Sequence, residues 1–119
     1  MTIIENSSDH RMAERIAAGL RRCIGVKKAI KCRQMVDKLK AEGFQNASDT
    51  KVRDIIRHLR RHQGMFICAD THGFYMAVTR DDRRHQINSM KSRIKEMNET
   101  LQAFLNIEEN DRRQAEMDI

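Results

Sequence analysis

The stretch Ser48–Val78 constrains the fold more than any other part of this 119-residue chain. Its first half has the periodicity of an amphipathic helix, with Ser48 or Asp49 as the N-cap and Gly64 as the stop signal. Four apolar residues share about 100° of arc on this helix; they are Val52, Ile55, Ile56 and Leu59. The helix is therefore predicted to pack by this face and to present basic residues on the opposite one.

Two short apolar runs follow this helix, at residues 65–69 and 74–78. Their length and composition are typical of β-strands. The loop between them, Asp70-Thr71-His72-Gly73, is polar and contains glycine, as hairpin turns do. Because strands this short need other elements for stability, the hairpin is expected to pack on the helices.

Two further helices are predicted before Ser48. The first runs from a cap at Ser8 or Asp9 to about Cys23, and the second from about Lys28 to Glu42. Each has apolar residues on one face, and glycines at 25 and 43 are the expected stops. Residues 1–8 are expected to be a flexible N-terminus.

A long helix is predicted after the hairpin, with Thr79 as its cap and acidic residues in its first turn. Six apolar residues recur at alternating steps of three and four; they are Ile87, Met90, Ile94, Met97, Leu101 and Phe104. This alternation is typical of a coiled coil, so residues 80–106 are predicted to form a C-terminal dimerisation helix. Residues 107–119 are polar and acidic, and they are predicted to form a disordered tail.

The positive charge of the chain is concentrated in its middle. Residues 20–66 hold 13 Lys and Arg against 4 Asp and Glu, a net charge of +9, whereas the rest of the chain has a net charge of −3. A basic concentration of this kind indicates a polyanionic partner. The alternative is a solvated basic surface on an ordinary helical protein.

Several classes of protein are disfavoured. The first residues lack a long apolar run, so neither a signal peptide nor a membrane span is predicted. The three cysteines form no CxxC pair, which favours a reducing intracellular compartment. No enzyme and no cofactor are predicted, because neither a phosphate loop nor a nucleophile–base set is present. His58 and His62 have the spacing of a metal pair, but no further ligands are tied to them, so no metal site is predicted.

The order helix, helix, turn, helix, hairpin, long helix resembles the small winged helix-turn-helix proteins found widely in bacteriophages and prophages. The likeness covers residues 10–105 and depends on a few short motifs; they are the run Thr50–Arg60 with its Val52-Arg53 and Leu59-Arg60 pairs, then Gly64, Ile67, Gly73-Phe74 and Ala77. Family members often have Gly-Tyr in the wing and proline before its first strand. This chain has Gly73-Phe74-Tyr75 and Phe66 at those places.

The fold is therefore predicted to be mainly α with a small β-hairpin. A winged helix-turn-helix domain would occupy residues 9–79, and a long coiled-coil-like helix would follow it. The resemblance implies DNA binding in transcription control or replication initiation. It also implies a location in the bacterial or host cytoplasm, in association with the nucleoid.

Arg53, Arg57 and Arg61 recur every four residues on the outer face of the third helix. The planar fork of arginine can donate to O6 and N7 of guanine together, and base contacts come mostly from the N-terminal part of a recognition helix. Thr50, Lys51, Arg53 and Arg57 are therefore predicted to contact base edges, and Arg61 a phosphate. Further DNA contacts are predicted outside this helix; they are Lys27, Lys28 and Lys31 at the start of the second helix, Ser48 at the cap and His72 at the wing tip.

Two functions from different classes remain open. The first is a sequence-specific double-stranded DNA-binding protein that works as a homodimer. The second is a winged-helix module that binds a host protein through its C-terminal helix. RNA binding is less favoured, because the few aromatic residues are needed for the core rather than for base stacking.

Overall fold

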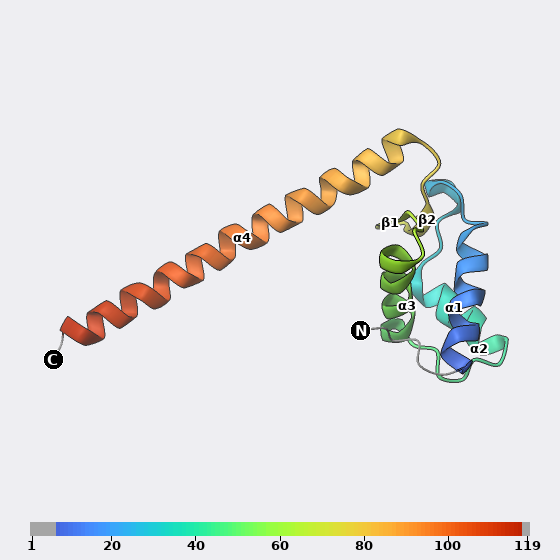
Figure 1. The fold of residues 1–119 in the computed structure, drawn as a ribbon, viewed down its shortest axis with the longest axis horizontal. Helices are drawn as coiled ribbons and strands as arrows, with labels where there is room; N and C mark the ends of the chain where they lie inside the picture. The colour runs from blue at the N-terminus through green and yellow to red at the C-terminus, as the bar shows by residue number, and fades with distance from the viewer. Residues whose placement is uncertain (1–6, 118–119) are drawn as a thin grey trace. The chain divides into compact units, whose positions relative to one another are not determined.

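The computed structural model describes residues 7–117, and the chain divides into two compact units at residues 1–84 and 85–119. It is mainly helical, with one two-stranded antiparallel sheet and a long C-terminal helix (Figure 1). This confirms the mainly α class with a small hairpin. None of the helices in residues 7–117 is both long enough and apolar enough to cross a membrane.

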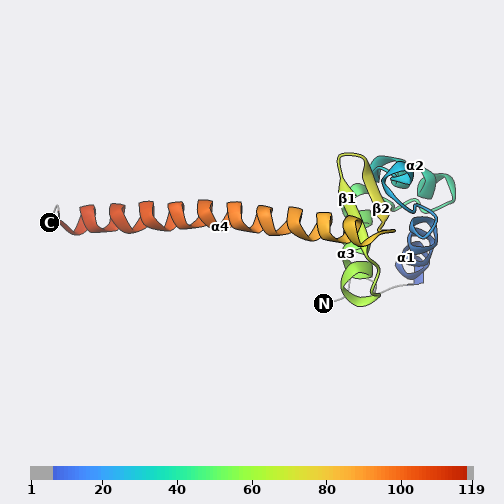
Figure 2. The same ribbon diagram turned by 90° about the horizontal axis from the view of Figure 1, so that it is seen from above.

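The first unit contains three packed α-helices, one short 3-10 helix and a hairpin; these are α1 (Ser7–Leu20), the 3-10 helix η1 (Val26–Lys28), α2 (Cys32–Ala41), α3 (Asp49–His62), β1 (Ile67–Asp70) and β2 (Gly73–Met76). Figures 1 and 2 both show the hairpin beside α3. The largest fully buried side chains come from α1, α3 and β1; they are Met12, Leu20, Val52, Ile55, Ile56 and Cys68. All four apolar residues of the α3 stripe are buried, as the periodicity predicts.

Side-chain caps set the start of two helices at the residues that the sequence indicates. The Ser48 hydroxyl oxygen accepts a hydrogen bond from the backbone N–H of Lys51, at 3.1 Å, and α3 begins at the next residue. The Thr79 hydroxyl oxygen accepts from the N–H of Asp82, at 3.1 Å, while the Asp82 carboxylate accepts from the N–H of Thr79, at 3.2 Å. This reciprocal arrangement is a capping box, and it starts the last helix at Arg80.

The beginning of the second helix differs from the prediction. Lys27 and Lys28 lie in η1, and α2 begins only at Cys32. Between them the backbone of Ile30 forms an antiparallel bridge with Phe74 of β2, through hydrogen bonds of 2.9 and 2.8 Å. The N–H and C=O groups of Ile30 are therefore hydrogen-bonded to the hairpin, and they are not available for a longer helix. A single bridge leaves no repeat in the sequence, so periodicity does not reveal it.

The first helix also ends earlier than expected, at Leu20 instead of Cys23. The carbonyl of Cys23 accepts a hydrogen bond from the N–H of Met76, at 2.7 Å. Both ends of the η1 segment are thus attached to β2. At the other end of α1, Ser7 and Ser8 are helical, whereas residues 1–6 of the expected flexible N-terminus lie outside the described residues.

The hairpin has a two-residue turn at Thr71 and His72, with Asp70 and Gly73 paired on either side. Gly73 has a φ of +121°, and a Cβ atom there would lie 2.4 Å from the carbonyl oxygen of Ile30. Such contacts are much too short, and this φ is itself unfavourable for other residues. Glycine therefore allows the hairpin to approach the chain entering α2.

The second unit consists of one helix over its described residues, because α4 (Arg80–Met117) continues through it. The expectation of a disordered tail from residue 107 is wrong for residues 107–117, which are helical. This segment has no Gly or Pro, and Glu109 pairs with Arg112 and Arg113 one turn away. Polar helix formers with such pairs favour a helix without any apolar face. Residues 118–119 lie outside the described residues.

Candidate nucleic-acid interface

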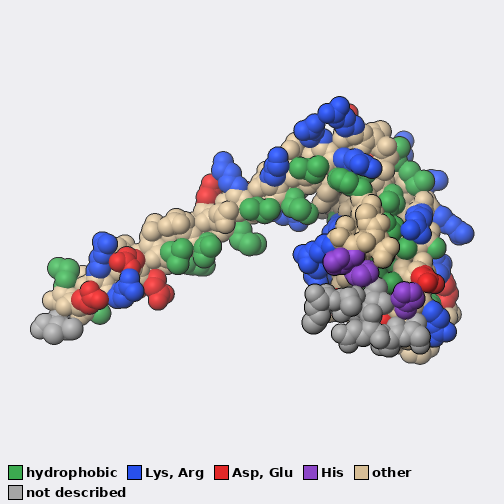
Figure 3. Space-filling model, viewed as in Figure 1, with side chains coloured by type: hydrophobic (Ala, Val, Ile, Leu, Met, Phe, Trp, Pro, Cys, Tyr) green, Lys and Arg blue, Asp and Glu red, His purple; other side chains and the backbone are tan. Residues whose placement is uncertain are grey.

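The outer face of α3 is basic and exposed. Thr50, Arg53, Arg57 and Arg61 are all exposed, and on a helical projection they lie opposite the buried apolar stripe. We call these four residues the α3 arginine face. The opposite face of α3 is packed in the core, which leaves the helix little freedom to rotate. The fold therefore fixes the spacing of these arginines along the helix. Lys and Arg side chains lie around the first unit in the view of Figure 3.

Arg57 is paired with a neighbouring carboxylate on the same helix. Its Nη1 lies 2.8 Å from Oδ1 of Asp54, and the two side chains are 52% and 32% exposed. An exposed pair of this kind contributes little stability. The guanidinium can therefore exchange Asp54 for another acceptor at small cost.

Lys51 is not part of this face. Its Nζ lies 3.0 Å from Oδ1 of Asp9 in α1, and the Asp9 side chain is only 6% exposed. A buried carboxylate needs a charged or hydrogen-bonding partner, so the Lys51 ammonium joins α3 to α1. This placement disagrees with the predicted base contact for Lys51. The sequence does not reveal it because Asp9 lies far away along the chain.

The N-terminal ends of α2 and α3 lie next to each other. The Cys32 sulfur is 3.7 Å from Oδ1 of Asp49 and 3.8 Å from the Asp49 carbonyl oxygen. Burial raises the pKa of the Cys32 thiol, the Asp49 carboxylate raises it further, and Arg53 opposes both effects. Arg53 is therefore close to the start of α2. Lys31 is the N-cap residue of α2 and is exposed, with its backbone N–H donating to the Gln34 side chain.

The remaining predicted contacts lie on other elements. Lys27 and Lys28 are exposed on η1, which lies beside β2 rather than at the start of α2. His72 is exposed at the hairpin turn, and its Nδ1 lies 3.1 Å from Oδ1 of Asp70. The Ser48 hydroxyl is used as the cap of α3. Arg53 is thus near Cys32 at the start of α2, while the Lys31 backbone lies against the hairpin, because a Cβ atom at Gly73 would be 2.8 Å from the Lys31 nitrogen.

The hairpin turn carries a carboxylate that the sequence analysis did not consider. Asp70 accepts a hydrogen bond from the backbone N–H of His72, at 2.7 Å, and one from the Tyr75 hydroxyl, at 3.4 Å. Burial, together with the Asp70 charge, raises the pKa of Tyr75 to about 12. Because Asp70 is negative, it opposes a phosphate at the tip, and His72 would offset this effect only when protonated.

Other basic residues hold the first unit together, and the sequence analysis gave them no structural role. The Arg60 Nε donates to the carbonyl of Ile67, at 2.9 Å, and its guanidinium lies 6.0 Å from the centre of the Phe74 ring. Arg15 on α1 forms a double hydrogen bond with the Glu42 carboxylate, at 2.7 and 3.0 Å. The Arg15 guanidinium lowers the pKa of Glu42. The Leu59-Arg60 motif was the only signal of such a role for Arg60.

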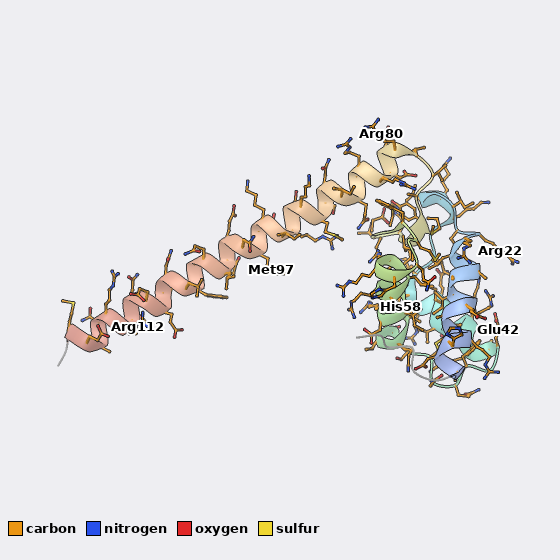
Figure 4. The ribbon with its side chains drawn as sticks, viewed as in Figure 1. Arg22, Glu42, His58, Arg80, Met97 and Arg112 are labelled. Carbon is orange, nitrogen blue, oxygen red and sulfur yellow. The ribbon has the colours of Figure 1, made fainter. Side chains whose placement is uncertain are left out.

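His58 and His62 lie close together on α3, with ring centres 5.1 Å apart. Figure 4 labels His58 on that helix. Its buried Nδ1 has no hydrogen-bond partner, and its ring lines a shallow groove with Ala13 and Ala17 of α1. Among residues 7–117 there is no group of three or more side chains suited to holding a metal ion.

No protein family, curated protein or solved structure matches this chain. What the interface binds must therefore be inferred from its own geometry and charge.

Proposed function

We propose that this chain is a sequence-specific double-stranded DNA-binding protein with a winged helix-turn-helix unit. In this proposal it is encoded by a bacteriophage or prophage, acts as a dimer in the bacterial cytoplasm, and serves in transcription regulation or replication initiation. The observation that carries the proposal is the division of α3 into two faces. One face is fully packed, and the other presents three exposed arginines and a threonine.

The distribution of charge between the two units supports a polyanionic partner for the first unit. Residues 1–84 hold 18 Lys and Arg against 10 Asp and Glu, whereas residues 85–119 hold 5 against 7. The first unit thus has a net charge of +8 and the second of −2. A basic unit joined to a weakly acidic helix is expected to bind phosphates through the former only.

In the proposed mechanism α3 enters the major groove. Thr50, Arg53 and Arg57 contact base edges, and Arg61 contacts a phosphate. Lys31, the exposed N-cap residue of α2, is assigned to a neighbouring backbone phosphate. Further backbone contacts are assigned outside α3; they are Lys27 and Lys28 on η1, the N-cap region at Ser48, and His72 at the wing tip. Lys51 is left out, because it pairs with Asp9.

A second function is favoured by one specific observation, the exposed apolar residues of α4. Met97 is 73% exposed and Phe104 is 65% exposed. A helix with such exposed apolar residues is suited to binding a partner protein. In this alternative the chain is a protein–protein interaction module that binds a host protein through α4, without any need for DNA.

The deciding experiment is selection of the full-length protein on a random duplex library, followed by sequencing of the bound fraction. DNA binding predicts an enriched motif, and affinity for it that falls steeply with salt because counterions are released. Arg57→Ala is expected to lower affinity for that motif by about 1–3 kcal/mol and to relax preference at one base position.

The matched control is Arg22→Ala, because Arg22 is exposed at the end of α1 and lies on the side of the first unit away from α3 (Figure 4). It removes the same charge and should leave the preferred motif unchanged. If no motif is enriched at low salt, the DNA proposal fails. Binding of a host protein that is lost on Met97→Lys would then support the interaction module.

A further inference from the structure

The apolar stripe of α4 has no cover within the described part of its own unit. Its six residues, from Ile87 to Phe104, are between 42% and 73% exposed, and residues 85–117 contain no second element that could pack against them. Figure 3 shows hydrophobic side chains along one side of this helix. Isolated helices gain little stability in water, so an exposed stripe of this length requires a partner.

Charged residues continue the same spacing beyond both ends of the apolar stripe. Stepping back from Ile87 by four and then three residues gives Arg83 and Arg80, and stepping forward from Phe104 by four and then three gives Glu108 and Asp111. All four are exposed, although the Arg83 guanidinium also lies over the Phe66 ring, 4.9 Å from its centre. The line of contact positions on α4 therefore consists of two arginines, six apolar residues and two carboxylates. We call this line the α4 seam.

We propose that the seam is covered by a second copy of α4 running in the antiparallel direction, in one particular register. In that register the six apolar positions meet in three kinds of pair; these are Ile87 with Phe104, Met90 with Leu101, and Ile94 with Met97. Each pair joins an a position to a d position, as antiparallel helix pairs require. No apolar residue of the seam is left opposite a polar one.

The same register pairs opposite charges at both ends of the seam. Arg83 meets Glu108 of the second copy, and Arg80 meets Asp111. By symmetry each contact occurs twice, which gives four ion pairs. Flanking charges are known to set partner choice and direction in paired helices. The seam is thus complementary to itself only when the second copy is reversed.

A parallel pair would place every seam residue against its own copy. Arg80, Arg83, Glu108 and Asp111 would each then face an identical charge, which is unfavourable. Outside these four residues the helix has the same asymmetry, because residues 80–95 hold 4 further Lys and Arg against 2 Asp and Glu, while residues 96–117 hold 2 against 4. Charge complementarity therefore selects the antiparallel direction over the parallel one.

This inference rests on the proposed dimer, but not on DNA binding. It can be tested by thiol cross-linking of the full-length protein in a background without native cysteines (Cys23→Ser, Cys32→Ser and Cys68→Ala). That background must first match the wild type in circular dichroism and in sedimentation. Two single-cysteine variants are then made in it, Ile87→Cys and Phe104→Cys, and each is treated with a short bis-maleimide alone and after mixing.

The antiparallel register predicts that only the mixture forms covalent dimers. Position 87 of one copy lies beside position 104 of the other, whereas two copies of position 87 are about 26 Å apart along the helix at 1.5 Å per residue. Cross-linking of each variant with itself would show a parallel pair and overturn the inference. A dimer that cross-links in neither way would overturn the register, and a monomer at tens of micromolar would overturn the second copy as occupant.

A charge reversal provides an independent measurement that needs no cysteine. Glu108→Lys with Asp111→Lys places lysines opposite Arg83 and Arg80 of the second copy, so the dimer dissociation constant should rise about tenfold or more. In a parallel pair positions 108 and 111 each face their own copy, so the same change only replaces carboxylate–carboxylate contacts by lysine–lysine contacts. The dimer dissociation constant should then stay the same. An unchanged dissociation constant would therefore contradict the antiparallel seam.

The matched control is Glu99→Lys with Glu116→Lys, which makes the same change of charge at positions off the seam. It should leave the dimer intact, provided that circular dichroism shows an unchanged helix content. DNA affinity is measured separately on the wild type. An antiparallel dimer that binds no duplex contradicts the proposed function alone, whereas a DNA-binding protein that pairs in parallel contradicts this inference alone.

Discussion

Helices α3 and α4 both carry an apolar stripe of helical period, but the two stripes have different environments. The residues of the α3 stripe are no more than 4% exposed, whereas those of the α4 stripe are at least 42% exposed. The α3 stripe is covered by elements of its own unit. The α4 stripe has nothing of its own unit over it in the described chain. Periodicity alone therefore identifies an interacting face, but it does not distinguish a core from an interface.

The largest effect is expected when the same side chain is shortened in each stripe. Ile55→Ala removes a fully buried side chain of α3 and should lower the free energy of unfolding of the first unit by about 2–5 kcal/mol. Ile94→Ala, the matched change in α4, should leave that unfolding unchanged and weaken self-association instead. Denaturation followed by fluorescence of the only tyrosine, Tyr75, reports on the first unit, and sedimentation reports on the dimer. Equal losses of stability from both variants would show that the two stripes belong to one core.

The next largest effect concerns the close approach of the hairpin to the segment entering α2. Gly73→Ala places a methyl group against the Ile30 backbone in a conformation unfavourable for alanine, so it should cost about 2–3 kcal/mol or more. Gly64→Ala is the control, because that glycine also has a positive φ but a Cβ there meets nothing within 4 Å. Thermal unfolding by circular dichroism measures both. If the two substitutions have equal effects, the cost comes from backbone conformation alone and not from the contact with Ile30.

Two basic residues of α3 are expected to have different roles, Lys51 in the stability of the first unit and Arg57 in DNA binding. Lys51→Ala leaves the buried Asp9 carboxylate without its ammonium partner and should destabilise the first unit by about 1–3 kcal/mol. Arg57→Ala removes a cation from an exposed pair, so its effect on stability should stay within about 0.5 kcal/mol. Chemical denaturation compares the two variants. A larger loss of stability from Arg57→Ala than from Lys51→Ala would reverse the assignment of these side chains.

The effect with the least influence near neutral pH is the pH dependence contributed by Tyr75, which appears only under alkaline conditions. Its pKa is raised from 10.0 to about 12 in the folded chain, because burial and the Asp70 carboxylate disfavour tyrosinate. The stabilisation that this gives is complete below pH 10 and is lost as the pH rises towards 12. Ultraviolet absorption of tyrosinate should show a midpoint near pH 12 for the folded protein and near 10 in denaturant. The absence of any difference between these midpoints would mean that Tyr75 is not buried in solution.

Local features of the fold were predictable from the sequence, because short-range chemistry decides them. The caps at Ser48 and Thr79, the buried face of α3 and the hairpin turn before Gly73 all depend on residues within a few positions of one another. The extension of α4 beyond residue 106 was missed for a different reason. A polar segment with paired charges can be helical without an apolar face, and its composition resembles that of a disordered tail.

The misplaced site residues reflect contacts between distant parts of the chain. Lys51 was expected at a base edge, but its partner Asp9 is 42 residues away. The bridge between Ile30 and Phe74 similarly displaces Lys27 and Lys28 from α2. None of these contacts leaves a periodic signal, so a single sequence does not reveal them.

The length of α4 also sets a distance. The first unit ends at Arg84, and in the antiparallel register this residue lies level with residue 107 of the second copy. In the proposed dimer the two points of attachment would therefore be about 34 Å apart along the helix pair, at 1.5 Å per residue. Half-sites one turn of DNA apart are separated by about 34–36 Å. The uninterrupted helix would thus set the distance between the two points of attachment. Inserting or deleting a heptad within it should change which spacing of half-sites is preferred.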